Sequence, residues 1–515
     1  MSSAATRSQG MVVTQHHLAV RAGLDALEAG GSAADAAVAA AAVLTVVDPR
    51  STGLGGDVFA LYWPAGTTTP EGLAAAGVSP AGLTPEALRD LGHRRMPVDG
   101  PWSITVPGAP AGWELLLERF GRLGRARVVS NAIGLARDGF EVAPRVADEW
   151  TTAVAKLRRS GAAASIYLVD GGAPKPGAQL VNPDLGATLE TFARAGSSDF
   201  YRGSIAERIA DTVAGLGGPL RASDLTGWGG PEWVTPLSVL FRGHDVYEMP
   251  PPGQGLVVLE ALAIYTGLRP SGHADEDHAA IESIKLAYDD ANEHLADPSI
   301  CPVPTARLLS EEWIAEQRGR ISGDDVLAAN VGRAGDTVYV AVVDAEGSAC
   351  SLIQSLYDGF GSGVVVPGTG LALQNRASGF TLRDGHPNQV GPGKRPYHTI
   401  IPAMLGRGAS FAGCLGVVGG YMQTQGQVQV LRNVFDRGMT PQQACDAPRF
   451  RVYRGCEVAF EEGYPPAVVA DLSARGHHVG VLDRFEGGGA QMILRDGDRF
   501  VGGSDVRKDG DVGVR

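Results

Sequence analysis

The sequence lacks a long hydrophobic run and a strongly basic stretch. Its longest mostly apolar segment, Ala36 to Val47, is shorter than the roughly 20 residues that cross a bilayer. Lys and Arg total 44 against 57 Asp and Glu, which leaves a net charge of −13. We therefore expect no membrane and no nucleic-acid partner. The first 17 residues also lack the apolar core of a signal peptide, so a cytoplasmic location is expected.

Cysteine and paired metal ligands are also scarce. The five cysteines are scattered and show no C-x-x-C spacing, which favours free thiols over a disulfide framework (Cys301, Cys350, Cys414, Cys445 and Cys456). The His16-His17 and His477-His478 pairs lack partners at metal-binding spacing. His278 and His294 fall about four turns apart on one expected helix, too far to share an ion. No metal and no other cofactor is expected.

What is present is a chain of 515 residues, 44% hydrophobic and 20% charged, which is long enough for a large core. Helical spacing dominates the first 300 residues, for example from His16 to Ala29, and a Ser32/Asp35 capping box starts a second helix that reaches Val47. Strand patterns gather later in the chain. This order predicts an α+β fold with helices packed on both faces of two stacked sheets. Strands are also expected at residues 102–106 and 399–404.

One later segment, Gly335 to Gly370, has the pattern of a β-hairpin. Val338, Val340 and Val342 alternate, a turn follows at residues 344–347, and residues 349–356 return as a second strand. The residues before it are small, polar and Gly-rich, a composition that stays flexible. Thr337 therefore stands where a flexible stretch enters a buried sheet.

A threonine at this place can have two roles. It can be an ordinary β-branched strand residue. It can also be a nucleophile, provided that the chain is cut before it, because an N-terminal Thr carries its own base, the α-amine. That amine has an unperturbed pKa of about 7.7–8.0, near the working pH. The second role requires cleavage of the Asp336–Thr337 bond.

The hairpin resembles the start of the small subunit in the γ-glutamyltransferase family of N-terminal nucleophile hydrolases. The resemblance continues through SLIQSLYDGFGSGVVVPGTG, LQNRASGF, GPGKRPYHTIIPA and VVGGYMQTQGQVQV, and it covers the N-terminal half, including AGGSAADAAVAAAAVLTVVDPRSTGLGGDVFALYW. It implies a four-layer αββα sandwich of two mainly antiparallel sheets. It also implies self-cleavage between Asp336 and Thr337.

The resemblance assigns further roles around Thr337. Ser355 stands where the family has a Thr that hydrogen-bonds the nucleophile. Gly419 and Gly420 match the oxyanion glycines, and a Gly-Gly between a strand and a helix can direct N–H groups at one spot. Read alone, that pair would be an ordinary turn. Tyr357 replaces a frequent Asn, and could either position a substrate or line the wall of the site.

Departures from the family pattern concern the substrate. The transferases hold the glutamyl α-carboxylate with an Arg, but residues 74–81 contain none. Arg376 stands in place of the Gln that holds the α-amine, Gly379 replaces an Asp, and His398-Thr399 replace a Ser-Ser pair. A cationic Arg repels an ammonium group and binds carboxylate. Arg376 could instead form an internal salt bridge, and His398 could be a satisfied buried histidine.

The sequence thus predicts a self-processing Thr hydrolase that acts on a small carboxylate-bearing or dicarbonyl amide, nearest to oxamate amidohydrolase and acylase-like members. Residues 1–336 and 337–515 would form an αβ heterodimer, with further pairing to (αβ)2 left open. One alternative is a true γ-glutamyltransferase or glutathione hydrolase. Another is an uncleaved, non-catalytic binding protein.

Overall fold

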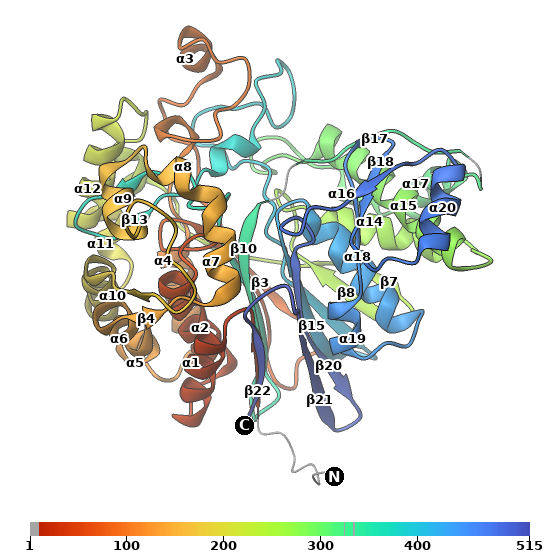
Figure 1. The fold of residues 1–515 in the computed structure, drawn as a ribbon, viewed down its shortest axis with the longest axis horizontal. Helices are drawn as coiled ribbons and strands as arrows, with labels where there is room; N and C mark the ends of the chain where they lie inside the picture. The colour runs from red at the N-terminus through yellow and green to blue at the C-terminus, as the bar shows by residue number, and fades with distance from the viewer. Residues whose placement is uncertain (1–9, 324, 333–334) are drawn as a thin grey trace.

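The structure is a computed structural model that describes residues 10–323, 325–332 and 335–515. Figure 1 shows two stacked sheets at the centre of the molecule, with helices from the first half of the chain outside one sheet and helices from the second half outside the other. This is the four-layer αββα arrangement. The α+β fold expected from the sequence is confirmed.

The first sheet has, within the described residues, seven strands in the order β22-β1-β10-β11-β2-β3-β6. All its neighbouring pairs are antiparallel. The expected hairpin forms its centre, so the nucleophile candidate lies on the most enclosed part of the sheet. The strands are β1 (Met11–Thr14), β2 (Asp57–Trp63), β3 (Glu71–Ala75), β6 (Glu232–Val234), β10 (Asp336–Val343), β11 (Ala349–Tyr357) and β22 (Asp511–Val514).

The second sheet has six described strands, also antiparallel, in the order β21-β20-β15-β14-β8-β7. They are β7 (Leu237–Phe241), β8 (His244–Glu248), β14 (Ala403–Arg407), β15 (Ser410–Val418), β20 (Gly489–Asp496) and β21 (Arg499–Ser504). The remaining described strands form separate two- and three-stranded sheets: β4 (Phe140–Glu141), β5 (Gln179–Leu180), β9 (Ala329–Asn330), β12 (Val365–Val366), β13 (Leu371–Ala372), β16 (Phe450–Val452), β17 (Arg454–Gly455), β18 (Glu457–Phe460) and β19 (His478–Val481).

Helices of the first half lie on the side of the first sheet, and most of them cover its outer face. They are α1 (His17–Glu28), α2 (Ala33–Val47), α3 (Pro85–Asp90), α4 (Ala109–Phe120), α5 (Arg125–Val128), α6 (Ser130–Asp138), α7 (Pro144–Trp150), α8 (Val154–Leu157), α9 (Gly161–Tyr167), α10 (Pro183–Ala195), α11 (Ser198–Arg202), α12 (Ser204–Gly215) and α13 (Ala222–Gly227), with 3-10 turns at Pro101–Ser103 and Thr151–Ala153. The capping box at Ser32 forms as expected, and every residue of α2 is buried. Its alanines allow it to pack closely on β10 and β11.

Helices of the second half cover the second sheet: α14 (Gly255–Thr266), α15 (His273–His294), α16 (Thr305–Leu308), α17 (Glu311–Gly319), α18 (Met422–Phe435), α19 (Pro441–Asp446) and α20 (Pro466–Ala474), with a 3-10 turn at Arg376–Gly379. No helix in the described ranges has both the length and the apolar character needed to span a membrane.

Three apolar layers hold the sandwich together. One lies between α2 and the first sheet, a second lies between the two sheets and includes Tyr339 and Met404, and a third lies between the second sheet and α14, α15 and α18. Strands β10 and β11 contribute to the first two layers, because alternate side chains point to opposite faces. Both faces of the hairpin are therefore buried, which holds Thr337 in a rigid frame.

Two strand predictions are wrong: one segment is not a strand, and the other strand begins later than expected. Residues 102–106 form a 3-10 turn and an unpaired extended stretch, in which Val106 N donates to Val78 O at 3.0 Å. The strand expected at residues 399–404 starts only at Ala403, because Pro402 has no N–H for the ladder. The short strands β1, β3 and β22 were not expected. The partners of β1 and β22 are remote in sequence, whereas β3 pairs with the nearby β2, and the short sequences of all three show no clear alternation.

Candidate active site

Thr337 lies at the start of β10, where the register of the hairpin shifts between Asp336 and Val338. Its side chain is buried, with 2% of the residue exposed. The Thr337 hydroxyl lies 3.4 Å from Ser355 Oγ, and Ser355 Oγ donates to the carbonyl oxygen of Asp336 at 2.5 Å. The structure thus gathers the threonine, the serine and the expected scissile carbonyl. Tyr357 N donates to Ser355 Oγ at 2.7 Å and orients the serine.

Gln423 completes the surroundings of the Thr337 hydroxyl. Its Nε2 donates to Thr337 Oγ1 at 3.1 Å, and its Oε1 accepts from Ile401 N at 3.2 Å. The sequence reading did not single out this residue. The available signal was its place in the first turn of α18, three residues after Gly420, where a side chain faces the mouth of the strand–helix turn.

Gly419 and Gly420 form the turn between β15 and α18, with φ of +115° and +61°. L-residues with side chains rarely adopt these values, which explains the two glycines. Neither N–H donates to an acceptor among the described residues. The Gly420 carbonyl accepts from Gln254 Nε2 at 3.0 Å, which holds the orientation of the turn. Free, preorganised N–H groups of this kind suit the stabilisation of an oxyanion.

Arg376 is a fully buried cation near the hairpin. Its Nη1 donates to Thr399 Oγ1 at 2.8 Å, and its guanidinium lies 4.2 Å from the centre of the Tyr357 ring. Its Nε and Nη2 atoms have no hydrogen-bond partner within the described residues, and no carboxylate there pairs with it. Burial lowers the pKa of Arg376, while the Asp57 charge raises it. The internal salt bridge considered for this residue is therefore not formed in this part of the chain.

His398 is buried against Asp57. Its Nε2 lies 3.0 Å from Asp57 Oδ2, and its Nδ1 accepts from Ile400 N at 3.4 Å. Burial, helped by the Arg376 charge, lowers the pKa of His398 to about 4. Both ring nitrogens are engaged, which is the arrangement of a satisfied core histidine. Of the two alternatives for His398, the structure favours that one over a substrate contact.

Asp336, the residue before the expected cut, forms an ion pair with Arg50. Arg50 follows α2 and is 8% exposed. Its guanidinium also lies 3.2 Å from Thr152 Oγ1 and 3.6 Å from Glu149 Oε2, and Glu149 in turn pairs with Lys508. The sequence reading used Asp48-Pro49 only to end a helix and overlooked Arg50, because its partner lies 286 residues away.

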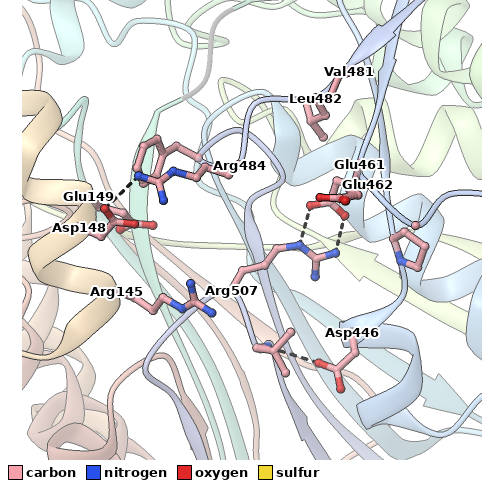
Figure 2. Close-up of a pocket in the computed structure, with 14 residues that line it drawn as sticks. Arg145, Asp148, Glu149, Asp446, Glu461, Glu462, Val481, Leu482, Arg484 and Arg507 are labelled. Atoms are coloured by element: carbon pink, nitrogen blue, oxygen red, sulfur yellow. Dashed lines mark hydrogen bonds and ion pairs between the residues drawn. The ribbon is translucent and has the colours of Figure 1, made fainter.

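A pocket of about 760 Å³ opens beside this ion pair. Arg50, Gly335 and Asp336 form part of one wall, and β18 and β19 form much of another. A neighbouring pocket of about 470 Å³, drawn in Figure 2, holds charged side chains that pair with each other: Arg507 with Glu461, and Arg484 with Asp148. The larger pocket, which reaches the expected scissile residue, is the better candidate for the substrate.

A separate buried group brings together His278, Glu282 and His477, with one ligand-type atom from each within 4.8 Å of the others. The sequence reading missed this group because His477 comes from a remote segment. Lys285 Nζ already donates to Glu282 Oε1 at 2.8 Å, and His278 Nδ1 lies 3.0 Å from His477 Nε2. The ammonium group neutralises the carboxylate that a metal would need, so the group is best described as a buried polar network.

The stacked sheets and the hairpin-borne threonine define a fold of the N-terminal nucleophile hydrolase type. The Gamma-glutamyltranspeptidase family model matches residues 19–514. The chain belongs to the gamma-glutamyltranspeptidase family, and it is an enzyme of the amidohydrolase and acyltransferase kind.

Three similar proteins illustrate the range within this family. The oxamate amidohydrolase proenzyme of Klebsiella pneumoniae is 36% identical, with 99% of each chain covered. The glutathione hydrolase-like YwrD proenzyme of Bacillus subtilis is 35% identical, also with 99% of each chain covered. The crystal structure of cephalosporin acylase from Bacillus halodurans superposes with a TM-score of 0.94 at 40% identity, covering 100% of this chain and 97% of the other.

Proposed function

We propose that this chain is a self-processing amidohydrolase in which Thr337, freed by cleavage of the Asp336–Thr337 bond, attacks a small anionic or dicarbonyl amide. The observation that carries the proposal is the contact set around Thr337. Its hydroxyl is buried between Ser355 and Gln423, and Ser355 also binds the carbonyl that must be attacked. Residues 1–336 and 337–515 would then be the two subunits. The cytoplasmic location stays a prediction.

In the first step, Thr337 Oγ attacks the Asp336 carbonyl carbon, and the bond to Thr337 N breaks to leave an ester. Water hydrolyses this ester, and the freed α-amine becomes the base of the mature enzyme. In turnover, the amine takes the hydroxyl proton as Oγ attacks the substrate carbonyl. The proton passes to the leaving amine, and water releases the acyl group. The N–H groups of Gly419 and Gly420, which have no acceptor among the described residues, would stabilise the oxyanion during turnover.

Arg376 supports the proposed substrate class. A buried guanidinium with two unpaired nitrogen atoms is costly, and a substrate oxygen anion would offset that cost. A free γ-glutamyl group carries an ammonium close to its carboxylate, and that ammonium would meet the same cation. Names of similar proteins, oxamate amidohydrolase and cephalosporin acylase, fit a role outside γ-glutamyl transfer.

A direct comparison of substrates tests this proposal. Purified enzyme is given a γ-glutamyl anilide, oxamate and anilides of simple dicarboxylic acids, and kcat/KM is measured for each. The proposal expects an anionic acyl group without an ammonium to be preferred by at least tenfold. Preferred turnover of the γ-glutamyl anilide would favour the alternative, a true γ-glutamyltransferase or glutathione hydrolase.

A further inference from the structure

The proposed self-cleavage changes the surroundings of Arg50. It binds the side-chain carboxylate of Asp336, and the proposed cut releases the backbone bond on the C-terminal side of this same residue. Arg50 is buried, so it depends on a partner anion for its stability. Before cleavage, the chain itself supplies that anion.

The surrounding charges make the loss of Asp336 significant. Arg50 and Lys508 face Glu149 and Asp336, so these four charges balance. Asp48 lies nearby, and burial raises its pKa to about 7, so it supplies only part of a negative charge at neutral pH. Cleavage gives Asp336 a terminal carboxylate, and for a substrate to reach Thr337 this chain end has to leave the site. The group then keeps a surplus positive charge at the pocket wall. That charge would attract another carboxylate.

The chemistry of self-cleavage indicates how far that carboxylate should lie from the scissile carbonyl. The ester formed during cleavage joins the Asp336 carbonyl carbon to Thr337 Oγ, and an acyl-enzyme formed from substrate is the same functional group on the same oxygen. In Asp336 the side-chain carboxylate is separated from that carbonyl carbon by two carbons. Arg50 is therefore placed to bind the far carboxylate of a four-carbon diacid while Thr337 holds the near carbonyl.

We propose that Arg50 becomes a specificity residue of the mature enzyme and selects acyl groups of the succinyl type, with a carboxylate two carbons from the scissile carbonyl. This inference rests on the proposed function. The overall reaction consumes one N-succinyl amine and one water, and it gives succinate and the free amine. The C–N bond breaks, a C–O bond forms at Thr337 and is then hydrolysed, and no oxidant, reductant or cofactor is needed.

The pocket accommodates this role. Its volume of about 760 Å³ lies beside Arg50 even with Asp336 in place. Arg50 is the only Arg or Lys among the described residues that line it. On another wall, the Glu486 carboxylate accepts from the Tyr453 hydroxyl and lies 3.5 Å from Arg451. Two further carboxylate side chains belong to the described lining, so the Arg50 wall is where an incoming carboxylate would be held.

The test is a series of anilides that differ only in the acyl group: malonyl, succinyl, glutaryl and butyryl, the last being the neutral analogue of succinyl. We measure kcat/KM for each, per mole of protein with Thr337 at an N-terminus. For the wild type, succinyl should exceed butyryl by at least tenfold and should exceed both other diacids. In Arg50→Gln the succinyl-to-butyryl ratio should fall at least fivefold, to the general anion preference that Arg376 provides, and Arg50→Lys should restore part of it.

Arg484→Gln is the matched control, because Arg484 is 68% exposed and pairs with Asp148 at a neighbouring pocket. It should keep the wild-type ratio. The inference is overturned if the wild-type kcat/KM is highest for the malonyl or glutaryl anilide, or if Arg50→Gln leaves the succinyl-to-butyryl ratio unchanged. It is also overturned if the fully cleaved enzyme hydrolyses none of the four anilides. If Arg50→Gln fails to cleave itself, the wild-type series and Arg50→Lys still decide. A wild type that never exposes Thr337 contradicts the proposed function itself.

Discussion

Two buried arginines lie close to the same hairpin, and they differ in what compensates their charge. Arg50 is paired with Asp336, while Arg376 contacts a threonine hydroxyl and an aromatic face and forms no ion pair among the described residues, although the Asp57 charge acts on it from a distance. An unpaired buried cation is costly, and an anionic ligand would offset that cost. In the proposed function, Arg376 would bind an anion without any change in the chain, whereas Arg50 would bind one only after Asp336 has left.

The largest effect should come from removing the unpaired cation. Arg376→Met should lower kcat/KM for every anionic acyl amide by about 10²–10³, because truncating one side of a buried charge pair costs about 2–5 kcal/mol. The loss should be much smaller for a neutral amide such as the butyryl anilide. The ratio of the two kcat/KM values is the readout. Equal losses on both substrates would assign Arg376 a structural role.

The second effect separates charge recognition from oxyanion binding. Gly419→Ala places a side chain at φ +115° and moves the neighbouring N–H groups, so kcat should fall by about 10². In contrast to Arg376→Met, this loss should be the same for anionic and neutral amides, because both form the same oxyanion. Steady-state kinetics on one pair of anilides measures it. A loss of kcat confined to the anionic amide would show that the glycine turn does not stabilise the oxyanion.

The third effect concerns the paired cation. Arg50→Gln should slow self-cleavage by about 10–100-fold, since hydrogen bonds to charged groups contribute about 1.5–3 kcal/mol and this one positions the scissile residue. Gel densitometry of freshly translated protein gives the rate. Asp336→Asn should slow cleavage by a similar factor, and the double variant should add little. Full additivity would mean that the two side chains do not act as a pair.

The smallest expected effect is on the free energy of unfolding, and it comes from His398, which feels the charge of Arg376. The pKa of His398 is about 4 in the fold, against a reference of 6.5, so the folded state favours the neutral ring. Stabilisation from this histidine is complete above about pH 6.5 and is lost as the pH falls towards 4, by roughly 3 kcal/mol in all.

Urea unfolding at pH 7.5 and pH 5.5 tests this effect. His398→Gln, which keeps a donor for Asp57, should lose about 1 kcal/mol less than the wild type between the two pH values. His478→Gln, at an exposed position in β19, is the control for the replacement of a histidine. An identical pH response in His398→Gln would show that folding does not lower the pKa of His398.

Sequence patterns predicted the parts of this molecule that depend on neighbours in the chain. The hairpin around Thr337, the Ser32 cap and the helix after Gly420 follow from local periodicity and turn chemistry. The family resemblance supplied Ser355 and the two glycines. Contacts between remote segments could not be read in this way. Arg50 meets Asp336 across 286 residues, and Gln423 meets Thr337 across 86.

The same limit applies to charge compensation. From sequence alone, Arg376 was equally compatible with a salt bridge and with a substrate site, because the choice depends on which carboxylates the fold brings near. Asp57 was not considered as a partner for His398, since β2 and residue 398 meet only through the stacking of the sheets. Such pairings are decided by tertiary packing.

The central claim is that Thr337 becomes an N-terminal nucleophile. Intact-mass measurement with N-terminal sequencing of purified wild type and Thr337→Ala tests it most directly. We expect the wild type to yield a fragment that begins Thr-Val-Tyr-Val and ends at Arg515, and Thr337→Ala to stay whole. A wild type that remains at 53.5 kDa after long incubation, without activity, would contradict the claim and favour an uncleaved binding protein.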